Sequence, residues 1–290
     1  MDRIFDSDLI TRRRLRAFRA ATTGADFLLA HHVADLSIRL ASVERRFQCA
    51  VTLHALSAAP AAALAASGKV ESVLRIEPDA AFLAGAPGLV SPVEALPLAP
   101  ESVDLAISML SLHETNDTPG LLAQIRKALR PDGLFLAALP GQDTLTELRA
   151  ALLAAETELT GGASPRVAPF MDVRAAGGLL QRAGFALPVA DTETLTIRYD
   201  TMFDLMRDLR AMGATSALAD RSRKPASRQL FLRAAQIYAE RYSDPDGRIR
   251  ATFSTVWMSG WAPHQSQQKP LRPGSAKASL AEALEKLKPS

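Results

Sequence analysis

A strand, a helix and a second strand, predicted in close succession, constrain the fold of this chain more than any other feature. Apolar residues alternate with smaller ones at 103–109, which predicts a buried strand that opens into a group of polar residues. Thr118 is expected to cap the helix that follows and Pro119 to begin it, with an apolar stripe that continues to Leu129. The continuous apolar run at 134–139 predicts a strand covered on both faces. This order forms a right-handed crossover of a parallel sheet, and ligands in such sheets bind beyond the carboxyl ends of the strands.

Composition excludes several classes of protein. The formal net charge of +3 over 290 residues is too small for a general nucleic-acid binder. The single cysteine, Cys49, excludes an internal disulfide and a cysteine-rich metal site, and it favours a reducing compartment. No apolar run approaches the roughly 18 residues of a membrane span, and Asp2, Asp6 and Asp8 argue against a transit peptide. We therefore expect a cytoplasmic protein with no nucleic-acid partner and no membrane span.

The other elements are predicted from the same spacing of apolar residues. Residues 1–47 are expected to be helical, and their arginines form either a solvated face or a lid that contacts an acidic partner. Asp143 or Thr144 is expected to cap a later helix, and the last strand is placed at an edge of the sheet. After residue 263 we expect an extended tail with a short helix that begins near Ser279. The remaining strands are expected at 49–54, 73–77, 88–90, 192–199 and 251–261, and the remaining helices at 58–66, 145–153, 172–183, 202–212 and 226–242.

Short motifs spread over nearly the whole chain match a known family. They lie at 4–6, 111–113, 116–117, 129–133, 141–149, 161–165, 202–206, 212–213, 260–261, 264, 266–267, 270 and 274–276. Together with seven predicted strands that end in an antiparallel pair, they resemble the methyltransferase-fold assembly factor of respiratory complex I. That family is related to the malonyl-carrier methyltransferase of biotin synthesis and has the class I S-adenosylmethionine-dependent methyltransferase fold.

The resemblance implies an α/β fold, with a seven-stranded Rossmann-like methyltransferase sheet, an N-terminal helical segment and a helical insertion before the last strand. The expected segments are 1–47 for the helices, 48–262 for the methyltransferase-like domain with its insertion at 201–242, and 263–290 for the tail. The resemblance also implies S-adenosylmethionine as the cofactor and a complex I subunit as the protein partner. It implies arginine as the target because the mitochondrial member of the family is known as an arginine hydroxylase.

The expected cofactor site departs from the family pattern. The family's first strand-to-helix turn is rich in glycine after an acidic residue, because glycine lets the backbone approach the cofactor. Residues 52–58 contain no glycine. Glu77, at the end of the second strand, is a candidate for the ribose hydroxyls or else a solvated carboxylate, and Glu94 stands near the position that contacts adenine in the family. The candidate cofactor-binding residues are Thr52, His54, Leu56, Glu77, Glu94, Ser108 and Leu110.

His113 and Asp143 are the candidate catalytic residues. Imidazole titrates near neutral pH and His113 follows the carboxyl end of a strand, although a lone histidine is also common as a structural residue. Asp143 lies in one of the retained motifs, and helix capping alone also explains it. His31, His32 and Asp35 lie close in sequence, but helical spacing does not turn all three toward one ion, so no metal site is expected.

Three functions remain open from the sequence. The first is a transferase that uses S-adenosylmethionine and modifies an arginine of a protein during complex I assembly. The second is a non-catalytic methyltransferase-fold assembly factor that has lost cofactor binding, which the missing glycines favour. The third is methylation of a small acid or of a carrier-bound acyl group. Because the first two differ in cofactor binding, the sequence leaves enzymatic activity undecided.

Overall fold

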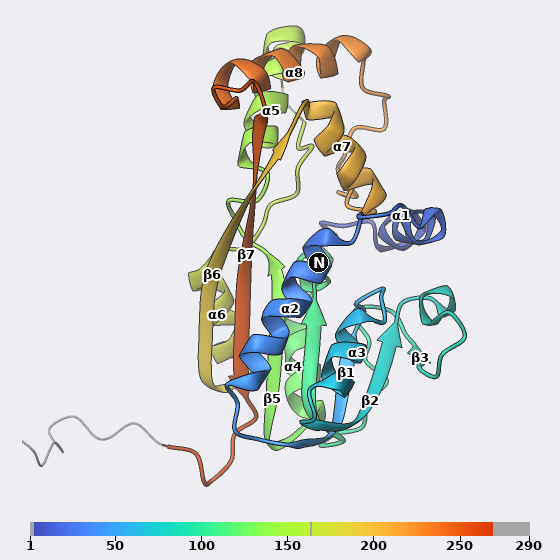
Figure 1. The fold of residues 1–290 in the computed structure, drawn as a ribbon, viewed down its shortest axis with the longest axis vertical. Helices are drawn as coiled ribbons and strands as arrows, with labels where there is room; N and C mark the ends of the chain where they lie inside the picture. The colour runs from blue at the N-terminus through green and yellow to red at the C-terminus, as the bar shows by residue number, and fades with distance from the viewer. Residues whose placement is uncertain (1–2, 163, 269–290) are drawn as a thin grey trace, which may run out of the picture.

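The computed structural model describes residues 3–162 and 164–268, which form a sheet of seven strands with helices on both faces (Figure 1). The strand order is β3-β2-β1-β4-β5-β7-β6. β1 to β5 are parallel to one another, and β7 is antiparallel to both of its neighbours. The predicted α/β class with a Rossmann-like methyltransferase sheet is therefore confirmed. The strands are β1 (Phe47–Leu53), β2 (Val70–Glu77), β3 (Leu89–Val90), β4 (Val103–Met109), β5 (Leu129–Pro140), β6 (Ala186–Tyr199) and β7 (Ile249–Trp261).

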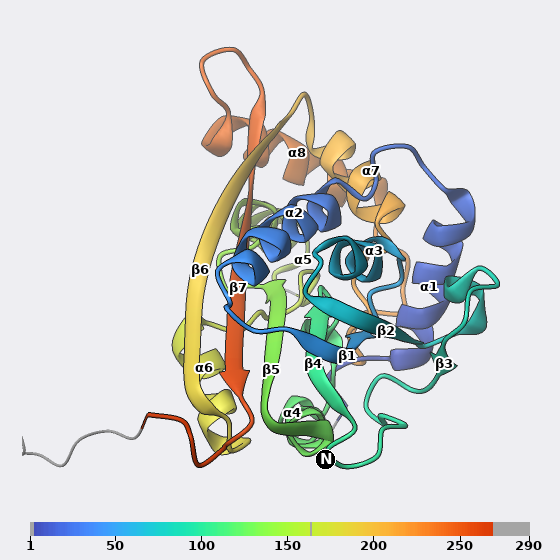
Figure 2. The ribbon, with the colours of Figure 1, turned by 60° about the horizontal axis from the view of Figure 1, so that its bottom comes forward.

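The helices lie on the two faces of the sheet and beyond one of its ends. α2 and α3 cover one face, and α4 and α6 cover the other (Figure 2). No helix in the described part of the chain combines the length and the apolar character needed to cross a membrane. The helix predicted near Ser279 lies outside the described residues. The α-helices are α1 (Ser7–Ala20), α2 (Phe27–Ala41), α3 (Ala59–Ala66), α4 (Thr118–Ala128), α5 (Thr146–Thr160), α6 (Val173–Arg182), α7 (Met202–Ala211) and α8 (Arg228–Tyr242), and the 3-10 helices are η1 (Ala80–Leu83) and η2 (Leu112–Glu114).

The apolar core has three parts that follow this arrangement. Leu122 and Leu180 belong to the cluster between the sheet and helices α4 and α6, whereas Leu36 and Leu64 belong to the cluster under α2 and α3. The third cluster, which includes Tyr238, lies where α5, α7 and α8 pack against the far ends of β6 and β7. These two strands, of 14 and 13 residues, extend beyond β5 and so hold the three helices away from the rest of the sheet (Figure 1).

The prediction that the last strand lies at an edge of the sheet is wrong. β7 hydrogen-bonds to β5 on one side and to β6 on the other, so β6 forms the edge. Along β6 exposed and half-buried residues alternate, as expected for a strand with one face in solvent. Trp257 of β7 is only 1% exposed. The buried run of β7 indicates a central strand, whereas the alternation of β6 indicates the edge.

Two predicted helix caps are also wrong. Asp117, rather than Thr118, caps α4, because its side chain accepts a hydrogen bond from the backbone N–H of Gly120. α5 begins after Leu145, which has a left-handed backbone and no capping side chain. The hydroxyl of Thr144 instead donates to the carbonyl oxygen of Ser254 on β7 at 2.6 Å. The start of α5 is therefore fixed by its attachment to the sheet and not by a local cap.

Candidate functional site

Three spaces lie beyond the carboxyl ends of the parallel strands. The large cavity, of about 380 Å³, lies between α5, α7, the segments 164–170 and 212–226, and η2. The inner pocket, of about 40 Å³, lies between α1 and the turns after β1 and β4. The outer groove, of about 710 Å³, lies between α1 and the segments that follow β2 and β3. The large cavity and the outer groove both have volumes in the usual range of ligand sites, about 300–1,000 Å³, and the lining of the large cavity is the more apolar of the two.

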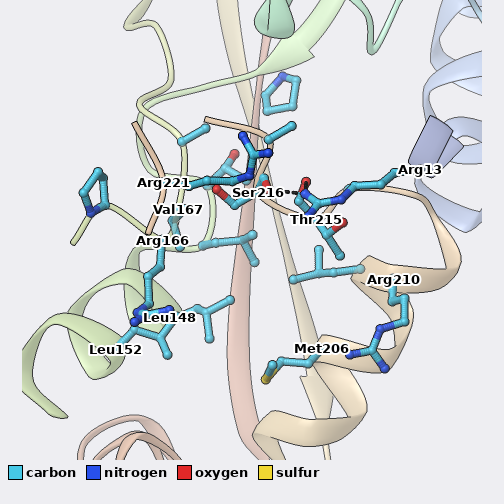
Figure 3. Close-up of a pocket in the computed structure, with 18 of the residues that line it drawn as sticks. Arg13, Leu148, Leu152, Arg166, Val167, Met206, Arg210, Thr215, Ser216 and Arg221 are labelled. Atoms are coloured by element: carbon cyan, nitrogen blue, oxygen red, sulfur yellow. Dashed lines mark hydrogen bonds between the residues drawn. The ribbon is translucent and has the colours of Figure 1, made fainter. Parts of the chain in front are cut away.

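The large cavity has apolar walls and a cationic rim (Figure 3). α7 contributes Met206 and Leu209, and α5 contributes Leu148 and Leu152. Glu114 is the acidic residue among the described residues that line it. The cations come from α1, α7 and both loop segments, namely Arg13, Arg166, Arg210, Arg221 and Lys224.

Three of these cations are held by groups of the protein itself. Arg13 donates to the carbonyl oxygens of Thr215 and Ser216, and Arg166 pairs with Glu156 at 2.6 Å. Arg221 pairs with Asp6 at 3.2 Å. Within the described residues, Arg210 and Lys224 have no carboxylate within ion-pair distance. The rim therefore presents positive charge that suits an occupant with carboxylate groups.

His113 and Glu114, both in η2, connect the large cavity to the inner pocket. His113 lines the cavity, and burial lowers the pKa of its imidazole to about 4. Glu114 lines both spaces and pairs with Arg14 of α1 at 2.5 Å. Burial raises the pKa of the Glu114 carboxyl, but the charge of Arg14, with His113 as a smaller contribution, outweighs it and the net pKa is lowered. The site thus holds a neutral imidazole beside an ionised, arginine-bound carboxylate.

The two candidate catalytic residues are not brought together. His113 lines the large cavity, but Asp143 is exposed and lines none of the three spaces. The sequence missed the residues that form the cationic rim, because they come from four separate segments of the chain. Two basic stretches of the sequence point to part of this rim: the arginine-rich start of α1 supplies Arg13, and the run at 221–224 supplies Arg221 and Lys224.

The turn after β1 keeps a glycine-like backbone but carries large side chains. His54 and Leu56 have φ of 52° and 60°, in the left-handed region that glycine adopts without strain. Both side chains line the inner pocket. Thr52, which stands in place of the family's acidic residue, is fully buried, and its hydroxyl has no partner within the described residues. The turn after β1 therefore keeps a backbone conformation that suits glycine, while the side chains of His54 and Leu56 line the inner pocket beside it.

The other candidate cofactor-binding groups also bond within the protein. The Oε2 atom of Glu77 accepts from the backbone N–H of Leu56 at 2.9 Å, and its Oε1 atom accepts from Arg75 at the same distance. Glu94 accepts from the backbone N–H groups of Asn116 and Asp117. These carboxylates stabilise the loops around the inner pocket.

At the end of β4 the pattern is the same. Ser108 and Ser111 share a hydrogen bond of 2.8 Å between their hydroxyls. Leu110 is half-buried with a φ of 54°, and its N–H donates to the carbonyl oxygen of Ala138.

The inner pocket and the outer groove share lining residues such as Thr11, Val93 and Glu94, so they form one cleft. Its outer part offers room for a flat ring, whereas its inner end, beside His54 and Leu56, is far below the volume of a ligand site. The residues present do not fit the methionine and ribose parts of S-adenosylmethionine in this conformation.

Acid is expected to destabilise the protein through its buried histidines. Burial lowers the pKa of His54, like that of His113, to about 4, below the ordinary 6.5. Between these values the unfolded chain binds more protons, so the free energy of unfolding falls by up to about 1.4 kcal/mol per pH unit for each histidine as the pH decreases. Urea unfolding at several pH values measures this slope. His54→Asn, which tolerates the left-handed backbone, is expected to reduce the slope, and an unchanged slope would contradict the assignment.

Comparisons of the sequence and of the structure with known proteins agree with the fold described above. A family model described as a methyltransferase domain matches residues 54–137. The fold matches a putative methyltransferase structure from Bacillus halodurans, with a TM-score of 0.56 at 12% identity, over 80% of this chain and 99% of that one. It also matches the YcgJ protein of Bacillus subtilis, with a TM-score of 0.54 at 14% identity, over 81% and 99%. The protein therefore has the fold of the class I S-adenosylmethionine methyltransferase-like proteins.

Its sequence relatives are more specific. The chain is 48% identical over 183 residues to the mitochondrial arginine-hydroxylase NDUFAF5 of Dictyostelium discoideum. The matched region covers 63% of this chain and 42% of that protein. It is 44% identical over 189 residues to the protein of the same name in Homo sapiens, a match that covers 65% of this chain and 54% of that protein. A malonyl-[acyl-carrier protein] O-methyltransferase of Laribacter hongkongensis is 39% identical over 194 residues, covering 67% and 63%. The chain thus spans about half the length of the first two relatives, and the predicted resemblance is confirmed.

The predicted cytoplasmic location is contradicted by these relatives. The NDUFAF5 proteins of Dictyostelium discoideum and Homo sapiens are both named as mitochondrial. The cytoplasmic prediction depended on the single cysteine, on the lack of a long apolar run and on the acidic residues near the start of the sequence. None of these features identifies the compartment in which the relatives work.

Proposed function

We propose that this chain is a methyltransferase-fold assembly factor for respiratory complex I that binds its partner protein in the large cavity without using S-adenosylmethionine. The similarity to the NDUFAF5 proteins and the resemblance of its motifs to the assembly-factor family support the biological role. The observation that carries the mode of action is the contrast in volume between the large cavity and the inner pocket next to the turn after β1. A cavity of about 380 Å³ lies beside a cofactor pocket of about 40 Å³.

The chemistry of the cavity indicates what it binds. Its walls accept apolar side chains, and the positive charge of Arg210 and Lys224 favours carboxylates at the entrance. The partner is therefore a complex I subunit that presents an apolar segment flanked by acidic residues.

Filling the cavity is expected to abolish the assembly function while the protein stays folded. Val167 is half-buried on the loop between α5 and α6 and lines the cavity (Figure 3). In a strain that lacks the native protein, Val167→Trp is expected to lower the level of assembled complex I by about tenfold or more, comparable to the loss of one interface hot spot. Leu159→Trp is the matched control, because Leu159 is 41% exposed on α5 and does not line the cavity. Normal complex I levels with a folded Val167→Trp protein would contradict the proposed binding site.

Arginine modification is a second candidate function, and one contact favours it. The carboxylate of Glu114, between the two spaces, already binds the guanidinium of Arg14, so its position suits an arginine. Mass spectrometry of complex I subunits from strains with and without the protein separates the two candidates. An arginine that carries an added oxygen atom or methyl group only in the presence of the protein would establish modification. Methylation, whether of an arginine or of a carrier-bound acyl group as in the name of the third relative, needs S-adenosylmethionine as the methyl donor, for which the inner pocket of about 40 Å³ offers little room.

A further inference from the structure

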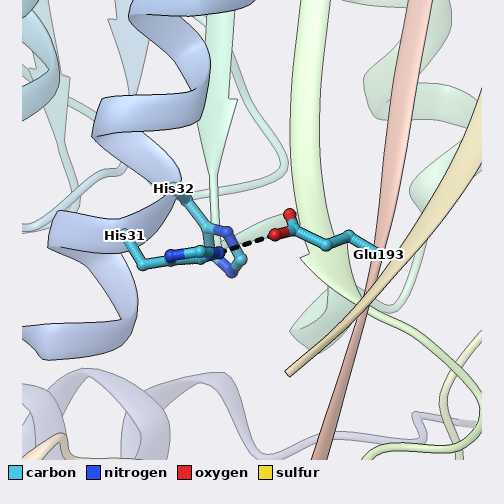
Figure 4. Close-up of side chains that lie close together, drawn as sticks. All are labelled: His31, His32 and Glu193. Atoms are coloured by element: carbon cyan, nitrogen blue, oxygen red, sulfur yellow. Dashed lines mark hydrogen bonds and ion pairs between the residues drawn. The ribbon is translucent and has the colours of Figure 1, made fainter. Parts of the chain in front are cut away.

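A second cluster of chemically active side chains lies between α2 and β6, outside the three spaces described above. His31 and His32 are consecutive residues of α2, and Glu193 comes from the edge strand (Figure 4). The Nε2 atom of His31 lies 2.7 Å from Oε1 of Glu193. The metal-ligating atoms that these three side chains offer all lie within 4.8 Å of one another. Asp35, considered from the sequence as the third ligand, instead pairs with Arg39 at 2.8 Å.

Two atoms of this cluster have unused hydrogen-bonding capacity. His32 is 1% exposed, and its Nε2 atom shares a hydrogen bond of 3.0 Å with the hydroxyl of Thr255 on β7. Its Nδ1 atom is buried and has no partner within the described residues, and the same holds for Oε2 of Glu193. Buried polar atoms without partners cost free energy, so a native structure that keeps two of them in one cluster needs an explanation. An ion bound between them satisfies both.

We propose that His31, His32 and Glu193 bind a divalent first-row transition-metal ion. Two imidazoles and one carboxylate are donors that suit Zn²⁺ and Fe²⁺, rather than the all-oxygen ligands that Ca²⁺ and Mg²⁺ prefer. Thr255 orients the ring of His32 through its other nitrogen, as outer partners of metal-bound histidines commonly do. Donors about 2.1 Å from one ion lie about 3–4 Å apart, which small rotations of the side chains achieve. The side chains of His31 and Glu193 are 37% and 36% exposed, so the site is accessible to an ion from solvent.

The metal site adjoins the large cavity. Leu28 lines the cavity one helical turn before His32 on α2, and Phe253 lines it two residues before Thr255 on β7. The rings of Phe27 and Phe253 also meet edge to face, with centroids 6.2 Å apart. The packing of α2 against β7 therefore connects the two sites, and a bound ion reinforces one wall of the cavity.

Titration of the chelator-treated full chain with Zn²⁺ tests this inference, with calorimetry as the readout and Co²⁺ absorption as a report on the ligand set. The wild-type chain is expected to bind a single ion. Glu193→Gln and His31→Gln are expected to weaken binding by about 100-fold or more, since even loss of an outer partner costs about 10–100-fold. Both residues are partly exposed, so both variants are expected to fold. Thr255→Val is expected to weaken binding by a smaller factor.

Two control variants keep the interpretation specific. Asp35→Asn removes a neighbouring carboxylate of α2, and His264→Gln removes an exposed histidine elsewhere. Both are expected to bind Zn²⁺ as the wild type does. Equal affinity of the wild type and both ligand variants, or no binding by the wild type, would overturn the proposed site. The readout is metal binding alone, so it is independent of the proposed assembly function.

Discussion

Arg75→Met is expected to lower the free energy of unfolding by about 3–5 kcal/mol, the usual cost of removing one member of a buried ion pair. Glu77 is fully buried, and Arg75 is 6% exposed. Arg75 bonds both to the Glu77 carboxylate at 2.9 Å and to the carbonyl oxygen of Phe82 at 2.8 Å. Without Arg75, both acceptors lose this donor inside the protein. Urea unfolding followed by circular dichroism measures the loss.

The pH dependence of this variant provides a further check. Burial already raises the pKa of the Glu77 carboxyl, although its bonds to Leu56 and Arg75 lower it in part. At pH values above 4.5, the ordinary pKa of a glutamate carboxyl, the unfolded chain releases the proton of Glu77. The folded Arg75→Met protein is expected to keep it. The variant should therefore recover stability relative to the wild type as the pH falls from neutral toward that value. Arg75→Met combined with Glu77→Gln is expected to restore part of the loss at neutral pH. If the free energy of unfolding of Arg75→Met alone lies within about 1 kcal/mol of the wild-type value, the Arg75–Glu77 pair is not important for stability.

Gly213→Ala is expected to have the second largest effect, a loss of about 2–4 kcal/mol, from backbone strain together with a steric clash. Gly213 has a φ of +75° at the end of α7. A Cβ atom there would lie 3.0 Å from the Cα of Arg14 and 3.3 Å from the Cβ of Ala17. The methyl group would push α1 away from α7, next to the contact between Arg14 and Glu114. Hydrogen exchange of α1 should increase together with the loss of stability.

Gly247→Ala is the matched control for this prediction. Gly247 has a φ of +84°, but a Cβ atom there would meet nothing within 4 Å. Its replacement introduces only the strain of the left-handed backbone, about 1 kcal/mol. The difference between the two variants measures the close approach of α1. Equal losses of stability in Gly213→Ala and Gly247→Ala would show that the position of α1 does not depend on the absence of a side chain at Gly213.

Much of the fold is predictable from the sequence because it depends on local spacing. The alternation at 103–109 and the apolar run at 134–139 correspond to β4 and to the buried part of β5. The order of the last two strands was not predictable in this way. β6 alternates as an edge strand does, but local spacing does not show that β7 pairs with β5 on one side and with β6 on the other.

The candidate site was less predictable, because it is assembled from distant segments. The missing glycines after β1 predict a crowded turn, and in the structure His54 and Leu56 line a pocket of about 40 Å³. No sequence pattern indicated that Arg75 binds Glu77 and occupies one of its oxygens. The meeting of His31 and His32 with Glu193 was also beyond reach, because 161 residues separate His32 from Glu193 in the sequence (193 − 32). Such contacts follow from the packing of α2 across the sheet.

Calorimetric titration of the purified chain with S-adenosylmethionine tests the central claim most directly. The small inner pocket and the internal bonds of Glu77 and Glu94 predict no binding, that is, a dissociation constant weaker than about 1 mM. S-adenosylhomocysteine, which lacks the transferred methyl group, is expected to behave in the same way. A dissociation constant of about 1 μM for either compound would contradict the account. It would mean that α1 and the turn after β1 move aside, and that the chain binds the cofactor of its fold.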